Sequence, residues 1–207
     1  LVEKGSKLRS HVGIAFPYSV VDLAATTDKD LLDLQWGIEN GVDFVAVSFV
    51  RNAADILQLR EIIKKGNSEI QLISKIERKD ALDNIHELMD VSDGIMVARG
   101  DLGLELPLEC LPLVQRALIR HANFRGIPVI VATQMMHSMV TAIRPTRAEV
   151  SDIAVAVVMG ADCLMLSEET AIGEHPVECV KYLTRIAAEA EKDFLSGEFK
   201  LNIRDSD

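Results

Sequence analysis

The stretch IQLISKIE, residues 70–77, together with DGIMVARGD, residues 93–101, sets the architecture of this chain. Each stretch is a nearly continuous run of apolar residues rather than an alternation of apolar and polar ones. Such runs are typical of parallel β-strands that are buried on both faces. Between them, apolar residues recur at helical spacing over residues 82–89. The two stretches therefore predict a strand–helix–strand unit.

Three further runs of the same kind extend this pattern in both directions along the chain. They are VDFVAVSFV at 42–50, IPVIVATQM at 127–135 and DCLMLSEET at 162–170. The five runs start about 23–35 residues apart, which is the length of a strand plus a crossover helix. The chain is therefore predicted to be an α/β protein with five parallel strands. Periodicity leaves two architectures open, a doubly wound sheet and part of an eight-stranded (β/α)8 barrel.

Length and charge restrict the domain count and the class of partner. The 207 residues fit one domain, which we expect to span residues 1–207. With 22 basic against 32 acidic residues the formal net charge is −10, and no stripe of Lys and Arg is present to bind nucleic-acid phosphates. No apolar run approaches the roughly 18 residues that a membrane-spanning helix requires. Nucleic acids and membranes are therefore not expected as partners.

The cysteine and histidine patterns give no sign of a disulfide framework or of a histidine metal site. The five histidines show neither HExxH nor HxH spacing. The cysteines are an odd number, widely spaced and without a CxxC pair: Cys110, Cys163 and Cys179. They predict reduced, mostly buried thiols in a cytoplasmic protein.

Polar side chains follow all five predicted strands at their carboxyl ends, where parallel α/β folds place their active sites. Lys75 and Glu77 stand two apart in one strand, so their side chains point to the same face. Glu77 and Asp101 arrive from neighbouring strands, and two such carboxylates are typical ligands of a divalent cation that shares a substrate oxygen. A plain salt bridge at a strand end is an equally good interpretation of Lys75 and Glu77.

Small and hydroxyl side chains accompany these charges. Gly100 and Gly103 frame Asp101, and glycines let backbone N–H groups approach an anion closely, although GDLG also fits an ordinary turn. Thr133 and Ser167 each follow an otherwise apolar strand, so their hydroxyls can bind a substrate carboxylate or pass a proton. Each can equally be a cap at the end of its strand.

Helix ends are marked in the sequence by glycines and by one capping signal. The segment RPTRAEVSDIA, residues 144–154, predicts a helix with Thr146 as its N-cap and Glu149 completing a capping box. Arg144 and Arg147 beside this helix start are either an anion clamp or ion-pair partners of Glu149 and Asp152. Four glycines are expected to end helices in the left-handed conformation: Gly41, Gly66, Gly126 and Gly160.

Five strings in this sequence together resemble the pyruvate kinase family, with matching order and spacing over roughly residues 11–192. They are ISKIE (73–77), SDGIMVARGDLG (92–103), ATQMMHSM (132–139), RPTRAEVSDIA (144–154) and MLSEETA (165–171). The resemblance implies a (β/α)8 TIM barrel, of which this chain would be the last five strands with their helices. The lid domain and the carboxy-terminal regulatory domain of that family have no counterpart here.

The resemblance also implies a reaction, the last step of glycolysis, in which phosphoenolpyruvate donates its phosphoryl group to ADP and the enolate is protonated to pyruvate. It implies that Lys75 stabilises the transferring phosphoryl group and that Glu77 and Asp101 bind Mg²⁺ or Mn²⁺. The family also uses K⁺, through ligands that have no counterpart in this chain, and is a cytoplasmic homo-oligomer, a tetramer when complete. It further implies that the substrate carboxylate is bound by Arg99, Gly100, Asp101 and Thr133. Ser167 is implied to belong to a proton relay to the enolate.

The sequence departs from the family pattern at two positions near the predicted site. His137 stands where the family commonly has Glu, and Glu168 stands where it has Gly. Strand alternation places Glu168 on the face opposite Ser167 and Glu169.

Three functional hypotheses follow from these observations. The first is the catalytic-barrel portion of a pyruvate kinase that acts in the complete protein. The second keeps the cation and the enolate but replaces phosphoryl transfer by lyase or aldolase chemistry. The third is an inert barrel fragment or assembly module, which the absence of three barrel strands favours because it leaves two open sheet edges.

Overall fold

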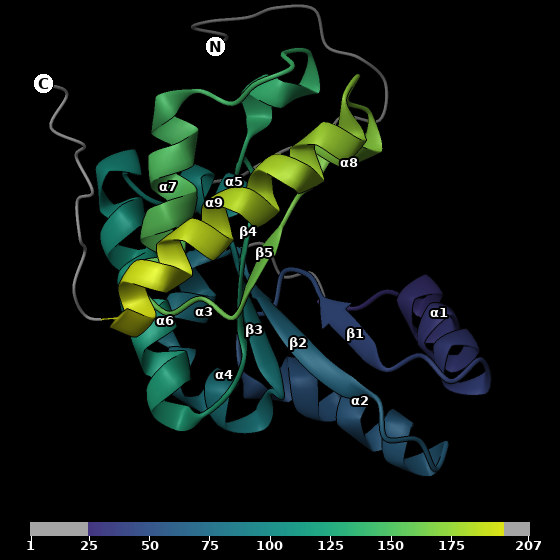
Figure 1. The fold of residues 1–207 in the computed structure, drawn as a ribbon. Coiled ribbons are helices and arrows are strands. Elements are labelled where there is room, and N and C mark those ends of the chain that lie inside the picture. Colours follow the sequence, from purple (N-terminus) through teal and green to yellow (C-terminus); the bar gives the residue numbers. More distant parts are fainter. Residues whose placement is uncertain (1–24, 197–207) are drawn as a thin grey trace, which may run out of the picture.

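The computed structural model describes residues 25–196 and shows a single parallel sheet flanked by helices (Figure 1). Its five strands are β1 (Phe44–Val47), β2 (Gln71–Ile76), β3 (Gly94–Ala98), β4 (Val129–Ala132) and β5 (Cys163–Met165). They lie in the order β1-β2-β3-β4-β5, and every neighbouring pair is parallel. A doubly wound sheet reverses its strand order at a switch point, whereas barrel strands follow one another without reversal. The order therefore confirms the prediction of a partial barrel.

Helices fill the gaps between the strands as the spacing predicts, with additional short helices at the strand ends. Because β3 ends at Ala98 and β5 at Met165, the predicted strands over 93–101 and 162–170 are too long, and helices α5 and α8 take their last residues. The helices are α1 (Asp28–Glu39), α2 (Ala53–Lys65), α3 (Lys79–Asp83), α4 (Ile85–Val91), α5 (Arg99–Glu105), α6 (Leu111–Arg125), α7 (Arg147–Val158), α8 (Glu168–Ala171) and α9 (Pro176–Ser196), with 3₁₀ turns η1 (Leu108–Cys110) and η2 (His137–Val140).

One face of the sheet packs against the helices and forms the core, while the other face is more open. In β2, Leu72, Ser74 and Ile76 are buried, whereas Ile73 and Lys75 between them are half-buried. Only β3 is buried at every residue. The prediction that all five strands are buried on both faces is therefore wrong. An apolar run shows that a strand can be buried on both faces, not that it is. Among the described residues, the second face of the outer strands is incompletely covered.

The capping box predicted before residue 150 is confirmed at the start of α7. Thr146 accepts a hydrogen bond from the N–H of Glu149, and the Glu149 carboxylate accepts one from the N–H of Thr146. Three of the four predicted left-handed glycines are also confirmed, at Gly41, Gly126 and Gly160. Gly66 is not left-handed, since its φ is −77°. The following residue, Asn67, takes that conformation instead with a φ of 50°, as asparagine readily does.

The cysteines are all free, but the prediction that they are mostly buried is wrong. Cys179 is buried, whereas Cys110 and Cys163 are exposed. Cys163 begins the edge strand β5, on whose outer side no described strand pairs. No helix within residues 25–196 combines the length and the apolar character needed to cross a membrane.

The Glu149 carboxylate gives the first testable prediction, because its ionisation is linked to folding. Burial opposes ionisation, but hydrogen bonds from Ser138 and Thr146 outweigh it and hold the pKa of Glu149 below its ordinary range. A lowered folded-state pKa contributes stability above the unfolded pKa, and this is lost as the pH falls through the folded value. We expect Glu149→Gln to lower the free energy of unfolding by about 1 kcal/mol at neutral pH.

The difference between wild type and Glu149→Gln should shrink as the pH falls below the ordinary carboxyl range, where the wild-type side chain also becomes neutral. Urea unfolding of both proteins at neutral and at successively lower pH measures it. A difference that does not change with pH would show that the charge of Glu149 contributes nothing.

Candidate active site

The ammonium group of Lys75 joins polar groups at the carboxyl ends of β1 and β2. Its Nζ lies 2.7 Å from Oε1 of Glu77 and donates a 2.7 Å hydrogen bond to Oγ of Ser48. The Glu77 side chain is only 2% exposed, and its Oε2 accepts a 2.7 Å hydrogen bond from the N–H of Phe49. The predicted same-face placement of Lys75 and Glu77 is confirmed. These two contacts fix the ammonium group of Lys75, and the side chain remains 24% exposed.

Asp101 and Gly100 lie in the first turn of α5, directly after β3. Arg99 and Asp101 are therefore helical residues, although the predicted strand over 93–101 includes both. Asp101 is exposed, whereas Arg99 is buried. A Cβ atom on Gly100 would lie 3.5 Å from Oγ1 of Thr133, which is an ordinary contact. Packing among the described residues thus does not require glycine at position 100.

The turn after β4 has an uncommon backbone conformation. Thr133 and Gln134 have φ values of 69° and 53°, in the left-handed region that costs a non-glycine residue roughly 1–2 kcal/mol. Oγ1 of Thr133 accepts a 2.7 Å hydrogen bond from the N–H of Gly100 and donates a 2.6 Å hydrogen bond to the carbonyl of Ala132. Two groups predicted to bind the substrate carboxylate, the hydroxyl of Thr133 and the N–H of Gly100, therefore lie together.

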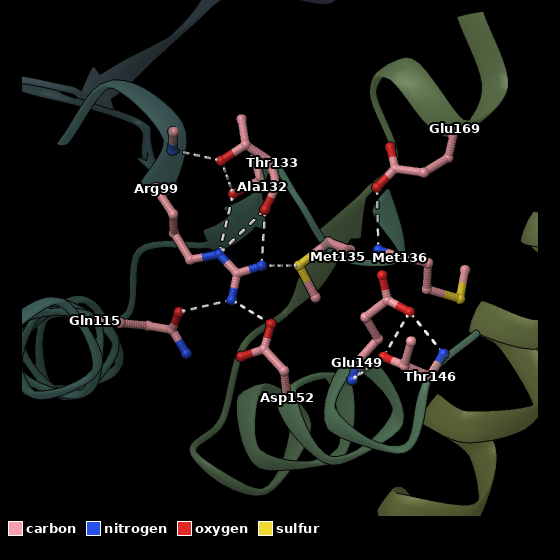
Figure 2. A network of polar contacts seen from close by, with 11 residues as sticks. Arg99, Gln115, Ala132, Thr133, Met135, Met136, Thr146, Glu149, Asp152 and Glu169 are labelled. Atoms are coloured by element: carbon pink, nitrogen blue, oxygen red, sulfur yellow. Dashed lines mark hydrogen bonds and ion pairs between the residues drawn. The ribbon is translucent and has the colours of Figure 1, made fainter. Parts of the chain in front are cut away.

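The Arg99 guanidinium contacts groups of α6, of α7 and of the turn after β4 (Figure 2). Its Nη1 lies 2.5 Å from Oδ2 of Asp152 on α7 and 3.4 Å from Oε1 of Gln115 on α6. Its Nη2 donates to the carbonyl of Thr133 at 2.7 Å and lies 2.9 Å from the sulfur of Met135. A direct contact between Arg99 and substrate stays a prediction, whereas its contacts with the Thr133 turn are present in the structure.

The end of β5 brings Ser167 and Glu169 to the same edge of the sheet as Thr133. Ser167 is partly buried, and its N–H donates a 2.9 Å hydrogen bond to Oε2 of Glu169. The other oxygen of Glu169 accepts a 3.0 Å hydrogen bond from the N–H of Met136 (Figure 2). Glu169 is 1% exposed. Sequence analysis predicts no role for Glu169 beyond its place at a strand end. Its two hydrogen-bond partners are backbone N–H groups, which every residue except proline has, so no residue type in the sequence indicates them.

The two departures from the family pattern contact each other. Nδ1 of His137 on η2 lies 3.1 Å from Oε2 of Glu168, and both side chains are more than half exposed. Strand alternation does not apply to Glu168, since it is the first residue of α8 rather than part of β5. The pair therefore links η2 to α8 at the surface. The strand argument for placing Glu168 opposite Ser167 and Glu169 therefore does not apply, although Glu168 is exposed and Glu169 is buried.

Arg144 and Arg147 are exposed beside the start of α7. The alternative in which they pair with Glu149 and Asp152 is wrong within the described part of the chain. Glu149 accepts hydrogen bonds from Ser138 and Thr146, and Asp152 pairs with Arg99. An anion clamp formed by Arg144 and Arg147 stays a prediction.

Comparison with known proteins agrees with the resemblance that the sequence strings indicate. Residues 1–180 match the family model described as the barrel domain of pyruvate kinase. The chain belongs to the pyruvate kinase family. It is 47% identical over 190 residues to pyruvate kinase from Dictyostelium discoideum, covering 92% of this chain and 38% of that protein. It is 49% identical over 192 residues to pyruvate kinase from Bacillus licheniformis, covering 92% of this chain and 33% of that protein.

The chain is also 50% identical over 190 residues to pyruvate kinase PKLR from Rattus norvegicus, covering 92% of this chain and 33% of that protein. It spans about a third of the length of the curated relatives it matches.

The oxygen donors at this edge of the sheet fit the divalent cation that membership of the pyruvate kinase family implies. No group of three or more His, Cys, Asp or Glu residues that could hold a metal occurs among the described residues. Mg²⁺ nevertheless needs only one or two protein carboxylates when waters and substrate phosphate oxygens complete its shell. Glu77, whose two oxygens lie against the ammonium group of Lys75 and the N–H of Phe49, and the exposed Asp101 on the next βα unit are the two carboxylates that would hold it.

Proposed function

We propose that this chain supplies the phosphoryl-transfer groups of a pyruvate kinase, which acts on phosphoenolpyruvate and ADP in the complete protein. The observation that carries the proposal is the ammonium group of Lys75, fixed by Glu77 and Ser48 at the carboxyl ends of the strands. Phosphoryl transfer requires positioned positive charge and little covalent chemistry from the protein. A rigidly held lysine beside carboxylates that can bind a cation meets that requirement.

In this proposal, each residue is assigned a role. Lys75 directs positive charge toward the phosphoryl oxygens, and Glu77 and Asp101 hold Mg²⁺ or Mn²⁺. The bound cation supplies charge neutralisation on the phosphate oxygens. The hydroxyl of Thr133 and the N–H of Gly100, hydrogen-bonded to each other at 2.7 Å, turn to the substrate carboxylate when it binds.

Ser167 belongs to the proton relay to the enolate in this proposal. Its N–H is anchored by Glu169, so its backbone position is defined while its side chain remains partly exposed. The K⁺ requirement, the nucleotide and the homo-oligomeric state of the family belong to the same proposal and concern the complete protein.

Binding of phosphoenolpyruvate by this chain is the direct test. We expect calorimetry to show phosphoenolpyruvate binding in the presence of Mn²⁺, and Lys75→Met to weaken it about 10–100-fold. That range corresponds to loss of a charge-assisted hydrogen bond worth roughly 1.5–3 kcal/mol. Lys181→Met is the matched control, because Lys181 lies on α9 and pairs with Glu178 at an exposed site.

Four outcomes separate the functional hypotheses. Binding that Lys75→Met weakens and Lys181→Met does not supports the kinase proposal. Equal affinities for wild type and Lys75→Met would contradict the role of Lys75. No binding to folded wild type would favour an inert fragment or assembly module, and retro-aldol release of pyruvate by the complete protein without ADP would favour a lyase.

A further inference from the structure

The strained Thr133–Gln134 turn is held from two sides by buried charged side chains that the proposed reaction does not use. Two consecutive non-glycine residues with positive φ persist only where the surroundings determine the backbone conformation. The turn follows β4. Arg99 from the preceding βα unit contacts the turn itself, and Glu169 from the following unit contacts Met136, two residues beyond Gln134. Figure 2 shows Arg99 on one side of the turn and Glu169 on the other.

Arg99 holds the carbonyl side of the turn. Its Nε and Nη2 atoms donate to the carbonyl oxygen of Thr133 at 3.2 and 2.7 Å. Asp152 and Gln115 fix the other end of the guanidinium, and the side chain is 9% exposed. The fork of donors in arginine allows one side chain to bind a carbonyl and a carboxylate at once. Residue 99 thereby connects the turn to α6 and α7.

Glu169 holds the segment that directly follows the turn. Its two oxygens accept hydrogen bonds from the N–H groups of Met136 and Ser167, so one carboxylate links the segments after β4 and β5. Full burial makes these bonds costly to lose, because each N–H would be left without a partner away from water. The same group thus fixes the backbone of Ser167 relative to the Thr133 turn.

We propose that Arg99 and Glu169 are positioning residues, which hold the Thr133–Gln134 turn so that the Thr133 hydroxyl faces the N–H of Gly100. This inference rests on the proposed function for the role of Thr133, and it assigns Arg99 to the turn rather than to the substrate. Loss of either anchor releases the turn from its left-handed conformation. The Thr133 hydroxyl then moves away from the N–H of Gly100, so the two groups no longer stand side by side to receive the carboxylate of phosphoenolpyruvate, while the cation ligands stay in place.

Amide hydrogen exchange of the ligand-free chain, followed by NMR, tests the positioning directly. In Arg99→Lys and Glu169→Gln we expect the Gly100 amide to exchange at least tenfold faster, although neither side chain touches it. The Ile95 amide, which donates to the carbonyl of Pro128 in the sheet, should keep its wild-type rate. Arg60→Lys is the matched control, because Arg60 likewise bonds a carboxylate and a carbonyl, those of Asp93 and Val91, before β3.

Calorimetry of the same variants adds the functional readout. We expect phosphoenolpyruvate affinity in the presence of Mn²⁺ to fall at least tenfold, with Mn²⁺ affinity alone within twofold of wild type. A general loss of structure would lower both affinities. Asp152→Asn provides a milder variant should Glu169→Gln fail to fold, since Asp152 is 38% exposed and contacts the turn only through Arg99.

Two results would overturn the proposal. One is an unchanged exchange rate of the Gly100 amide in the folded variants. If Arg99→Lys leaves that rate unchanged and still weakens phosphoenolpyruvate binding, Arg99 contacts the substrate itself. The other is an equal acceleration in Arg60→Lys. If wild type binds no phosphoenolpyruvate, the proposed function fails, and the exchange rates still decide whether Arg99 and Glu169 position the turn.

Discussion

Replacing Glu77 by glutamine is expected to lower the affinity of the chain for Mn²⁺ by at least about 100-fold. Removing a group that only orients a ligand already costs 10–100-fold in metal affinity, and Glu77 is proposed as a ligand itself. The carboxylate also sits between two donors, the ammonium group of Lys75 and the N–H of Phe49. A glutamine amide can accept from only one of them and must direct its NH₂ group at the other.

The two consequences of Glu77→Gln, on metal binding and on stability, are separated by measuring both. Calorimetric titration with Mn²⁺ gives the affinity, and thermal unfolding without metal gives the stability. Asp101→Asn should reproduce the loss of affinity with little loss of stability, because Asp101 is exposed. Glu189→Gln on α9 is the control, since Glu189 is 71% exposed in an ion pair with Lys192. Wild-type affinity in either Glu77→Gln or Asp101→Asn would remove that residue from the metal site.

The parts of the fold that depend on where apolar runs occur in the sequence could be predicted. The runs at 70–77 and 127–135 contain β2 and β4, because branched apolar residues between helical segments have few other solutions in a parallel sheet. The pairing of Lys75 with Glu77 was predictable for a related reason. It depends only on the period of two in a strand, and β2 stays extended up to Ile76.

Strand ends could not be predicted, and the errors at the site follow from this. DGIMVARGD continues beyond Ala98 with Arg99, Gly100 and Asp101. The N-cap position of α5 is Ala98, whose side chain cannot accept a capping hydrogen bond, so the sequence carries no N-cap signal for a helix that begins at Arg99. The destination of the Arg99 side chain depends on Asp152, which is 53 residues away in sequence. Contacts between residues so far apart in sequence depend on how the βα units pack against one another. Local sequence patterns do not reveal that packing.

Replacing Ile95 by alanine is expected to cost about 2–5 kcal/mol of the free energy of unfolding, which is the range for a cavity left by a large buried side chain. Ile95 lies in β3, the central strand, with Ser74 of β2 and Val129 of β4 as its register partners. It is fully buried in the core that the helices cover. For a chain of this size the loss corresponds to a decrease in Tm of roughly 4–20 °C.

The measurement shows whether the five strands form a cooperative core by themselves. Ile172→Ala is the matched control, because Ile172 is 72% exposed after α8 and the same atoms are removed. A packed core predicts a large decrease in Tm for Ile95→Ala and a change within about 0.5 kcal/mol for Ile172→Ala. Similar small changes in both variants, with a broad unfolding transition, would mean that the sheet is loosely packed and that further parts of a complete pyruvate kinase are needed to order it. In that event the positions of Lys75 and Glu77 would also depend on those parts, because β2 is held between β1 and β3.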